Sequence, residues 1–548
     1  MQSKNLIMKR ITALILCAVL VFSLCGCDLH DYVPEPETVR AEAIAFDKMQ
    51  YTRPDVTKLR SLTDEICSKA RTLFGFSRTV KLTGEFFDLY TEYSSMSNIA
   101  RIRSDLNVSD EYWMDEYAFC SEESGEVNNM VMEICLACAK SPWQRFYDLV
   151  LFDGLLKSEY TSDDGEGFSL SDELPELKRK EAELINEYVG LYAELCANED
   201  EKALEKFNEP IGKIYVELIK TRREIAKLQN CESCEELAYR SYGRSYAPSE
   251  LIDFKAAIKE YIVPVYKSVQ DSQAKKDAKP KSMSSGEAFS AVLDCTKGLN
   301  DTIDEAIEFM IKYGLYDVSD SDNKYEQSYV SYISKYDAPF LFVSPYGKEN
   351  DVPSIVHELG HFVDDYVNFG ADDDIDSSEV FSQALEYLVL GNIKDAELAE
   401  RLTRYKLFET LTIFSEQAWL DAFETEAYKL SDEELTVENL NDLYLRLAGE
   451  YGIEDQSDGE LCMEWISVPH FFEYPFYVIS YCVSNTAAFS LYQKELSQKG
   501  SGLETYMRLI DGASVNGFLT LMDAVRLPSP ISKDTVRDIA DTLEKMTK

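Results

Sequence analysis

The chain has 548 residues, of which 99 are Asp or Glu, 55 are Lys or Arg and only four are His, so its formal net charge is −44 at pH 7. Hydrophobic residues make up 45% of the sequence and aromatic residues 12%, which excludes a disordered or fibrous protein. This length allows one large or two ordinary globular domains. The negative charge repels phosphate backbones and anionic lipid headgroups, so we expect no nucleic-acid partner.

The N-terminus has the pattern of an export signal. Three basic residues among the first ten precede an apolar stretch over 11–24, which is too short to span a bilayer comfortably. The following Cys25-Gly26-Cys27 resembles the lipobox of bacterial lipoproteins, in which a cysteine becomes the lipidated first residue. We predict a lipoprotein signal peptide over 1–26 and lipidation at Cys27, which would anchor an extracytoplasmic protein to the bacterial membrane. The alternatives are an ordinary cleaved signal and an N-terminal anchor helix.

Most of the remaining chain has helical periodicity. Residues 27–56 contain three prolines and mixed charges and are typical of a tether. From about Thr57 onward, apolar residues recur at i, i+3, i+4 and i+7 with charged residues opposite. The clearest helical segments are Leu174–Leu195, Ile211–Leu228, Pro248–Val269, Ala288–Tyr313 and Ile393–Leu420. The breaks between segments are too short for a free linker, so we expect packed helical lobes.

One short segment departs from the helical pattern. Residues 338–344 read Ala-Pro-Phe-Leu-Phe-Val-Ser, which is rich in aromatic and β-favouring residues and bounded by Pro339 and Pro345. We predict a strand here, shortly before the next motif.

Residues 357–361 read His-Glu-Leu-Gly-His. On a helix, His357 and His361 lie one turn apart on the same face, where two imidazoles can bind one zinc ion, and Glu358 lies beside them. At this histidine content the pattern arises by chance in roughly three chains per thousand. Catalytic zinc usually takes three protein ligands, so a third one is needed.

The third ligand is predicted on the following helix. We expect Ser377 or Ser378 to cap a helix that opens with Glu379. Glu379, Gln383 and Glu386 form one polar stripe on an otherwise apolar helix, and a buried carboxylate stripe is expected where it faces a metal. We assign Glu379 as the third ligand and the other two as groups that orient the histidines. The alternative for Glu379 is an N-terminal helix charge favoured by the dipole.

A second group of candidate catalytic residues lies downstream. His470 precedes a run of aromatic residues, and on a helix beginning near Pro475 the side chains of Tyr477 and Tyr481 are i, i+4 neighbours. Their hydroxyls could donate to the oxyanion that develops when water attacks a peptide carbonyl. The alternative is aromatic core packing, since the chain has 34 tyrosines.

Three blocks together resemble the thimet oligopeptidase and oligoendopeptidase F family of zinc peptidases. They are His-Glu-Leu-Gly-His, Glu379-x-x-Ser-Gln-x-x-Glu386, and His470 with Pro475-Phe-Tyr477-x-x-x-Tyr481. The similarity runs from about Cys231, through Tyr239–Tyr246 and Pro339–Val343, to Gly512 and the C-terminal helices, with a weaker helical match upstream. Three departures are Asp364 in place of a common histidine, a shorter loop between the zinc helices, and a divergent N-terminal lobe.

The resemblance implies a mainly α, two-lobed zinc peptidase with a deep central channel and a small β-sheet beside the zinc helix. The N-terminal helical lobe would span 57–230 and the catalytic region 231–548. The strand Pro339–Ser344 would pair with the extended backbone of the substrate. The implied site holds one Zn²⁺ per chain on His357, His361 and Glu379, with Glu358 as the general base and His470, Tyr477 and Tyr481 stabilising the transition state.

The sequence therefore predicts a zinc-dependent oligoendopeptidase that hydrolyses internal bonds of short unfolded peptides outside the cytoplasm. We expect contact with the membrane only through the N-terminal lipid anchor. The alternative is a catalytically inactive lipoprotein that binds peptides. The intact Glu358 argues against it, because a binding protein needs neither the base nor the metal.

Overall fold

The computed structural model describes residues 43–152, 173–198, 200, 202–270, 272, 275–276, 279–370, 374–454, 459–512 and 517–547. The predicted signal peptide, Cys27 and most of the predicted tether lie outside these residues. Helices dominate the described residues, and their strands form one small sheet, which confirms the mainly α fold class. No helix among them combines the length and the apolar run that crossing a bilayer requires.

The chain forms two compact units. The first comprises Met1–Phe168, Asn323–Tyr325 and Tyr332–Ala338, and the second comprises the rest. The helices between residues 174 and 228 belong to the second unit, so this division does not coincide with the lobe boundary expected at residue 230. That boundary stays a prediction.

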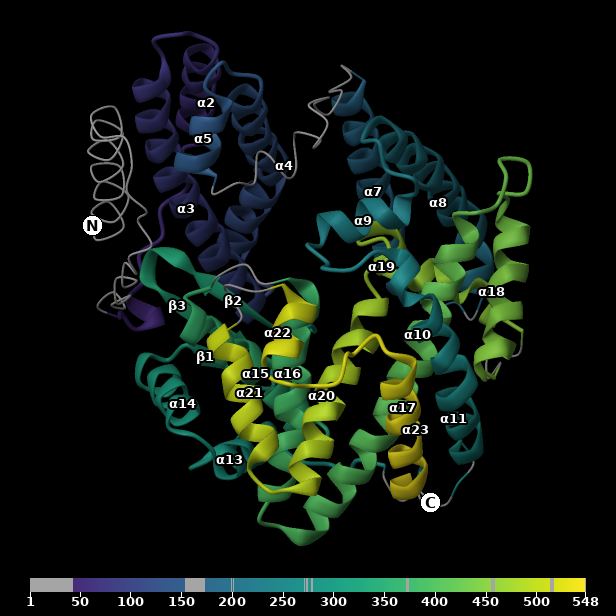
Figure 1. The fold of residues 1–548 in the computed structure, drawn as a ribbon. Coiled ribbons are helices and arrows are strands. Elements are labelled where there is room, and N and C mark those ends of the chain that lie inside the picture. Colours follow the sequence, from purple (N-terminus) through teal and green to yellow (C-terminus); the bar gives the residue numbers. More distant parts are fainter. Residues whose placement is uncertain are drawn as a thin grey trace, which may run out of the picture. The chain divides into compact units, whose positions relative to one another are not determined.

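Helices of the first unit pack around one apolar core (Figure 1). They are α2 (Val56–Ala70), α3 (Phe76–Leu106), α4 (Glu111–Ala139) and α5 (Gln144–Leu151). Ile66, Phe86 and Tyr147 lie fully buried in this core. Asp55 and Asp110 cap α2 and α4, because their carboxylates accept backbone N–H groups of the first helical turn.

The second unit holds the other helices, in chain order. They are α7 (Leu174–Cys196), α8 (Ala203–Leu228), α9 (Cys234–Ser241), α10 (Ile252–Ala257), α11 (Val263–Val269), α13 (Ser285–Thr296), α14 (Asp301–Tyr313), α15 (Asp351–Asn368), α16 (Ile375–Val389), α17 (Ala396–Ala427), α18 (Val437–Tyr451), α19 (Pro469–Glu473), α20 (Ile479–Ser497), α21 (Ser501–Gly512), α22 (Phe518–Ala524) and α23 (Lys533–Thr547).

Two expected helices are interrupted in the structure. The segment expected over 288–313 is split between α13 and α14, because Gly298 adopts φ +75° and Asn300 caps the second helix with its side chain. The segment over 248–269 is split by a π-helical turn at Ile258–Ile262, which lies between α10 and α11.

Helix α16 lies at the centre of the second unit, in contact with α15, α20 and α21 (Figure 1). Every residue from Glu379 to Leu390 is buried, so its polar stripe faces protein and not solvent. Helix α15 approaches it closely at Gly360, where an added Cβ would lie only 2.6 Å from the backbone O of Phe381. The glycine therefore allows the two helices to meet backbone against backbone.

The small sheet has the order β1-β3-β2, formed by Tyr316–Asp317, Ala338–Phe342 and Tyr329–Ile333. The expected strand near residue 340 is confirmed as β3, and all of its residues are buried. Its expected pairing with a substrate backbone is wrong, because β3 is the central strand with a hydrogen-bonded neighbour on each side. On the β1 side, Val343 N donates to Asp317 O at 2.9 Å.

Candidate metal centre and active site

Helix α15 carries His357, Glu358 and His361 on a firmly held scaffold. The fully buried Asp351 anchors its first turn, since its carboxylate accepts three backbone N–H groups of the preceding loop at 2.9 to 3.1 Å. Val356, Leu359 and Val363 are buried, as the apolar pattern of this helix predicts.

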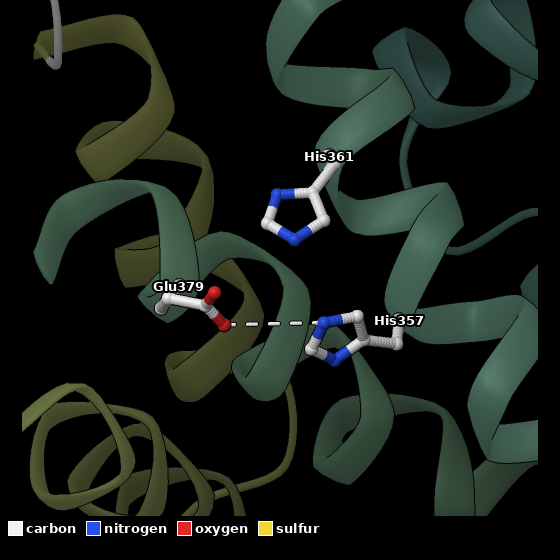
Figure 2. Close-up of side chains that lie close together, drawn as sticks. All are labelled: His357, His361 and Glu379. Atoms are coloured by element: carbon white, nitrogen blue, oxygen red, sulfur yellow. Dashed lines mark ion pairs between the residues drawn. The ribbon is translucent and has the colours of Figure 1, made fainter. Parts of the chain in front are cut away.

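The three predicted zinc ligands converge. Figure 2 shows His357 and His361 projecting from α15 toward Glu379 of α16, and one ligand atom of each lies within 4.8 Å of the others. His357 Nε2 is 3.9 Å from Glu379 Oε2, which is buried without a hydrogen-bond partner in the described part of the chain. Such an oxygen is costly unless a cation satisfies it. Two imidazoles and one carboxylate are a zinc donor set, so these residues fit zinc.

Glu386 fixes the orientation of His357. The ring Nδ1–H donates to Glu386 Oε1 at 2.9 Å, which leaves Nε2 free for a metal. The other carboxylate oxygen accepts from Lys406 Nζ at 2.6 Å, and Lys406 also donates to Glu409 Oε2 at 2.8 Å. Sequence reasoning missed Lys406, which is 2% exposed on α17. The available signal was a lysine one turn after the buried Leu402, on the apolar face of that helix.

The expected cap of α16 is wrong. The helix begins at Ile375, and Asp374 caps it by accepting Ser377 N at 3.0 Å. Ser378 instead places its Oγ 3.4 Å from His361 Nδ1 and so contacts the second histidine. Gln383 is buried, but its Oε1 has no partner among the described residues, and its orienting role stays a prediction.

Burial shifts the pKa of each titratable group at this site. Burial raises the pKa of Glu358 to about 7, although the nearby His357 opposes the shift. Burial lowers the pKa of His361 to about 3, which keeps this ring neutral. Burial also opposes protonation of His357, yet the hydrogen bond and the charge of Glu386 raise its pKa to about 9. The buried carboxylates thus stabilise positive charge at this point, as a divalent cation would supply.

The downstream residues lie beside the zinc ligands. His470 is on α19, Tyr481 is on α20, and Tyr477 lies between the two helices. Tyr477 donates its hydroxyl hydrogen to Glu379 Oε1 at 3.3 Å, and the Tyr481 hydroxyl is 3.4 Å from His470 Nε2. The structure therefore brings all three candidates together, although the expected helix from Pro475 is wrong, because α20 begins only at Ile479.

Two buried charged residues hold the turn that carries Tyr477. Phe476 has φ +59°, which breaks the helix there, and its backbone N–H donates to Glu424 Oε2 at 2.7 Å. Arg244 Nη2 donates to the carbonyl oxygens of Phe476 and Tyr477 at 2.9 and 3.2 Å. Sequence reasoning assigned no role to either residue, although Arg244 lies in the similar stretch Tyr239–Tyr246.

A third buried arginine contact holds the helix that carries His470. Arg222 of α8 donates from Nη1 to the carbonyl oxygen of Phe471 at 2.9 Å and from Nη2 to that of Phe472. Its Nε also donates to Glu181 Oε1 at 2.8 Å, so its charge is paired. The residues missed in the sequence are therefore buried arginines, acids and a lysine that position the predicted site.

Replacing Glu386 by glutamine is expected to weaken zinc binding by about 10 to 100-fold, because the amide no longer gives His357 a charged acceptor. The free energy of unfolding should fall by about 1–3 kcal/mol, since buried Lys406 keeps only Glu409 as a charged partner. Zinc titration and urea unfolding measure both effects. The matched control is Glu400→Gln, which breaks the exposed pair with Arg404 on the same helix and should change stability by less than about 1 kcal/mol. Equal behaviour of the two variants would contradict the role of Glu386.

Comparisons with known proteins agree with this geometry. Residues 46–148 match the peptidase M3 N-terminal domain, and residues 299–511 match peptidase family M3. Oligoendopeptidase F, chromosomal, from Lactococcus lactis subsp. cremoris is 26% identical over 202 residues, which are 32% of this chain and 31% of that protein. The match thus spans about a third of that relative's length.

Solved structures share the fold over nearly the whole chain. PZ peptidase A, solved with an inhibitor, has a TM-score of 0.75 at 20% identity and covers 92% of this chain and 99% of its own. A Bacillus anthracis str. Ames protein, provisionally described as an oligoendopeptidase F, has a TM-score of 0.71 at 20% identity, with 92% and 98% covered. The two matched family ranges together cover more than half of the sequence. The chain therefore belongs to peptidase family M3.

Proposed function

We propose that this protein is a zinc-dependent oligoendopeptidase that hydrolyses internal bonds of short, unfolded peptides. Membership of peptidase family M3 and the similarity to an oligoendopeptidase F support this proposal. The observation that carries it is the convergence of His357, His361 and Glu379 beside Glu358. Zinc bound by these three residues would polarise the scissile carbonyl and lower the pKa of a water molecule.

The residues of the chain itself divide the remaining chemistry. Glu358 takes a proton from the attacking water and returns it to the leaving amine. Tyr477 and His470 lie beside Glu379, where donors can stabilise the negative charge that develops on the carbonyl oxygen. Tyr481 contacts His470 and supports its position.

Removal of zinc is expected to stop peptide cleavage by the full chain, and one equivalent of added zinc should restore it. The readout is mass spectrometry of a mixed library of short peptides that also contains one folded protein, which should stay intact. Magnesium should not restore activity, because imidazole donors suit zinc and magnesium prefers oxygen ligands. Absence of any cleavage while one zinc ion is bound would contradict the proposal and favour the inactive peptide-binding alternative.

The proposed location is extracytoplasmic, with the chain anchored as a lipoprotein through Cys27. The support is the sequence alone: a basic start, an apolar stretch over 11–24, and small residues next to Cys27. This proposal is independent of the catalytic one. Recovery of the full chain from the producing cells in the aqueous phase after detergent phase separation would contradict it.

A further inference from the structure

The first unit exposes large apolar side chains at one end. Leu73 and Phe74 lie in the turn between α2 and α3 and are 64% and 100% exposed. Phe146 and Leu149 lie one turn apart on α5 and are 53% and 63% exposed. Trp143 Nε1 donates to Leu73 O at 3.0 Å, so the turn and the start of α5 lie side by side. We refer to Leu73, Phe74, Phe146 and Leu149 as the apolar tip.

Buried contacts hold the apolar tip from beneath. The Phe76 ring stacks on Tyr147 with 5.1 Å between centroids, and it also contacts the Trp143 ring at 5.7 Å. Ser141 Oγ donates to Ala70 O at 2.5 Å, which fixes the end of α2 to the segment before α5. The exposed side chains are therefore presented by a packed framework. Grouped apolar side chains on a protein surface mark an interaction site, whereas single ones do not.

The surroundings of the apolar tip are basic, although the whole chain carries a net charge of −44. Across residues 69–78 and 139–150 five residues are basic, and only Asp148 is acidic. Four of the basic residues are exposed and form no ion pair with any residue that the structure describes: Lys69, Arg71, Lys140 and Arg145. Charges farther away than a Debye length of about 8 Å are largely screened at physiological salt, so these local charges decide what approaches the tip.

We propose that the apolar tip docks on an anionic lipid surface. Exposed aliphatic and aromatic side chains ringed by Lys and Arg are the pattern of interfacial membrane-binding segments. Anionic headgroups attract the basic residues, and the apolar side chains enter the boundary between headgroups and acyl chains. The proposal adds a second membrane contact to the expected lipid anchor. A chain held by that anchor needs only a weak contact here, because tethering raises the effective concentration of the tip.

Hydrogen exchange of the full chain tests this docking. The chain is mixed with vesicles of phosphatidylcholine alone or of phosphatidylcholine with phosphatidylglycerol. Backbone amides in the 71–75 turn and in α5 should exchange about tenfold more slowly on the anionic vesicles. Raised salt should remove the difference, because it screens the basic residues. An anchor at the N-terminus recruits the chain to both kinds of vesicle, so failure to bind neutral vesicles would contradict the anchor and not the tip.

Surface variants complete the test. The double variant Leu73→Ser/Phe74→Ser and the charge reversal Arg71→Glu/Arg145→Glu should each abolish the slower exchange. The matched control is Tyr112→Ser/Met114→Ser, which changes two side chains that are 55% and 46% exposed at the far end of α4 and should leave the protection intact. Equal exchange on both vesicles would overturn the proposal.

Protection of the same amides without vesicles would also overturn it, by identifying another occupant of the tip. Protection that depends on protein concentration would identify a second copy of the chain. Protection that does not depend on it would identify residues 153–172, which follow α5 directly and contain five acidic residues.

Discussion

Replacing Glu358 by glutamine is expected to lower kcat by about 10⁴-fold while leaving one zinc ion bound and KM nearly unchanged. Glutamine has the shape of the native side chain but cannot take a proton from the attacking water or return it to the leaving amine. The zinc ligands His357, His361 and Glu379 are untouched, so metal content should not change. Steady-state kinetics with a quenched fluorescent peptide, combined with metal analysis, measures both quantities.

The matched control for this variant is Asp364→Asn, on the same helix. Asp364 is also a buried carboxylate, and it accepts a hydrogen bond from Asn368 Nδ2 at 2.7 Å. It belongs to none of the zinc ligands, so its variant should retain kcat within a few-fold. A Glu358→Gln enzyme that keeps more than about a tenth of the parent kcat at full zinc occupancy would contradict the general-base role.

The zinc site could be predicted from the sequence because its parts are local. His357 and His361 lie within one helical turn, and the stripe that begins at Glu379 follows on the next helix. Helical periodicity alone therefore places each ligand on a face. The caps were less certain: Asp374 rather than a serine caps α16, because the turn before the helix lets its carboxylate reach Ser377 N.

The supporting residues could not be predicted because their contacts are distant in the sequence. Arg244 reaches Phe476 across 232 residues, and Glu424 reaches the same residue across 52. No local pattern encodes such a pairing, since only the packing of helices brings these groups together. The same reason explains β3: its composition predicts a strand, whereas its central place depends on Tyr316 and Asp317, which pair with it from outside the motif.

Replacing Tyr477 by phenylalanine is expected to lower kcat by about 10² to 10³-fold, with a much smaller change in KM. The hydroxyl lies 3.3 Å from Glu379 Oε1, next to the position of the metal ligands, where a donor stabilises charge that develops only in the transition state. Loss of such a donor therefore affects turnover more than substrate binding. The phenyl ring keeps its packing against Tyr242, with 5.8 Å between ring centroids, so the fold should be preserved.

Two measurements separate this role from mere support of Glu379. If Tyr477 only held that carboxylate, the Tyr477→Phe variant would bind zinc more weakly and saturating zinc would restore its kcat; such a recovery would contradict the proposed role. The second measurement is the Tyr481→Phe variant, which removes the neighbouring hydroxyl that contacts His470 Nε2 at 3.4 Å and no printed zinc ligand of the site. Its kcat should fall less than that of Tyr477→Phe, because only the Tyr477 hydroxyl reaches the carboxylate of Glu379 and hence the position where the carbonyl oxygen reacts.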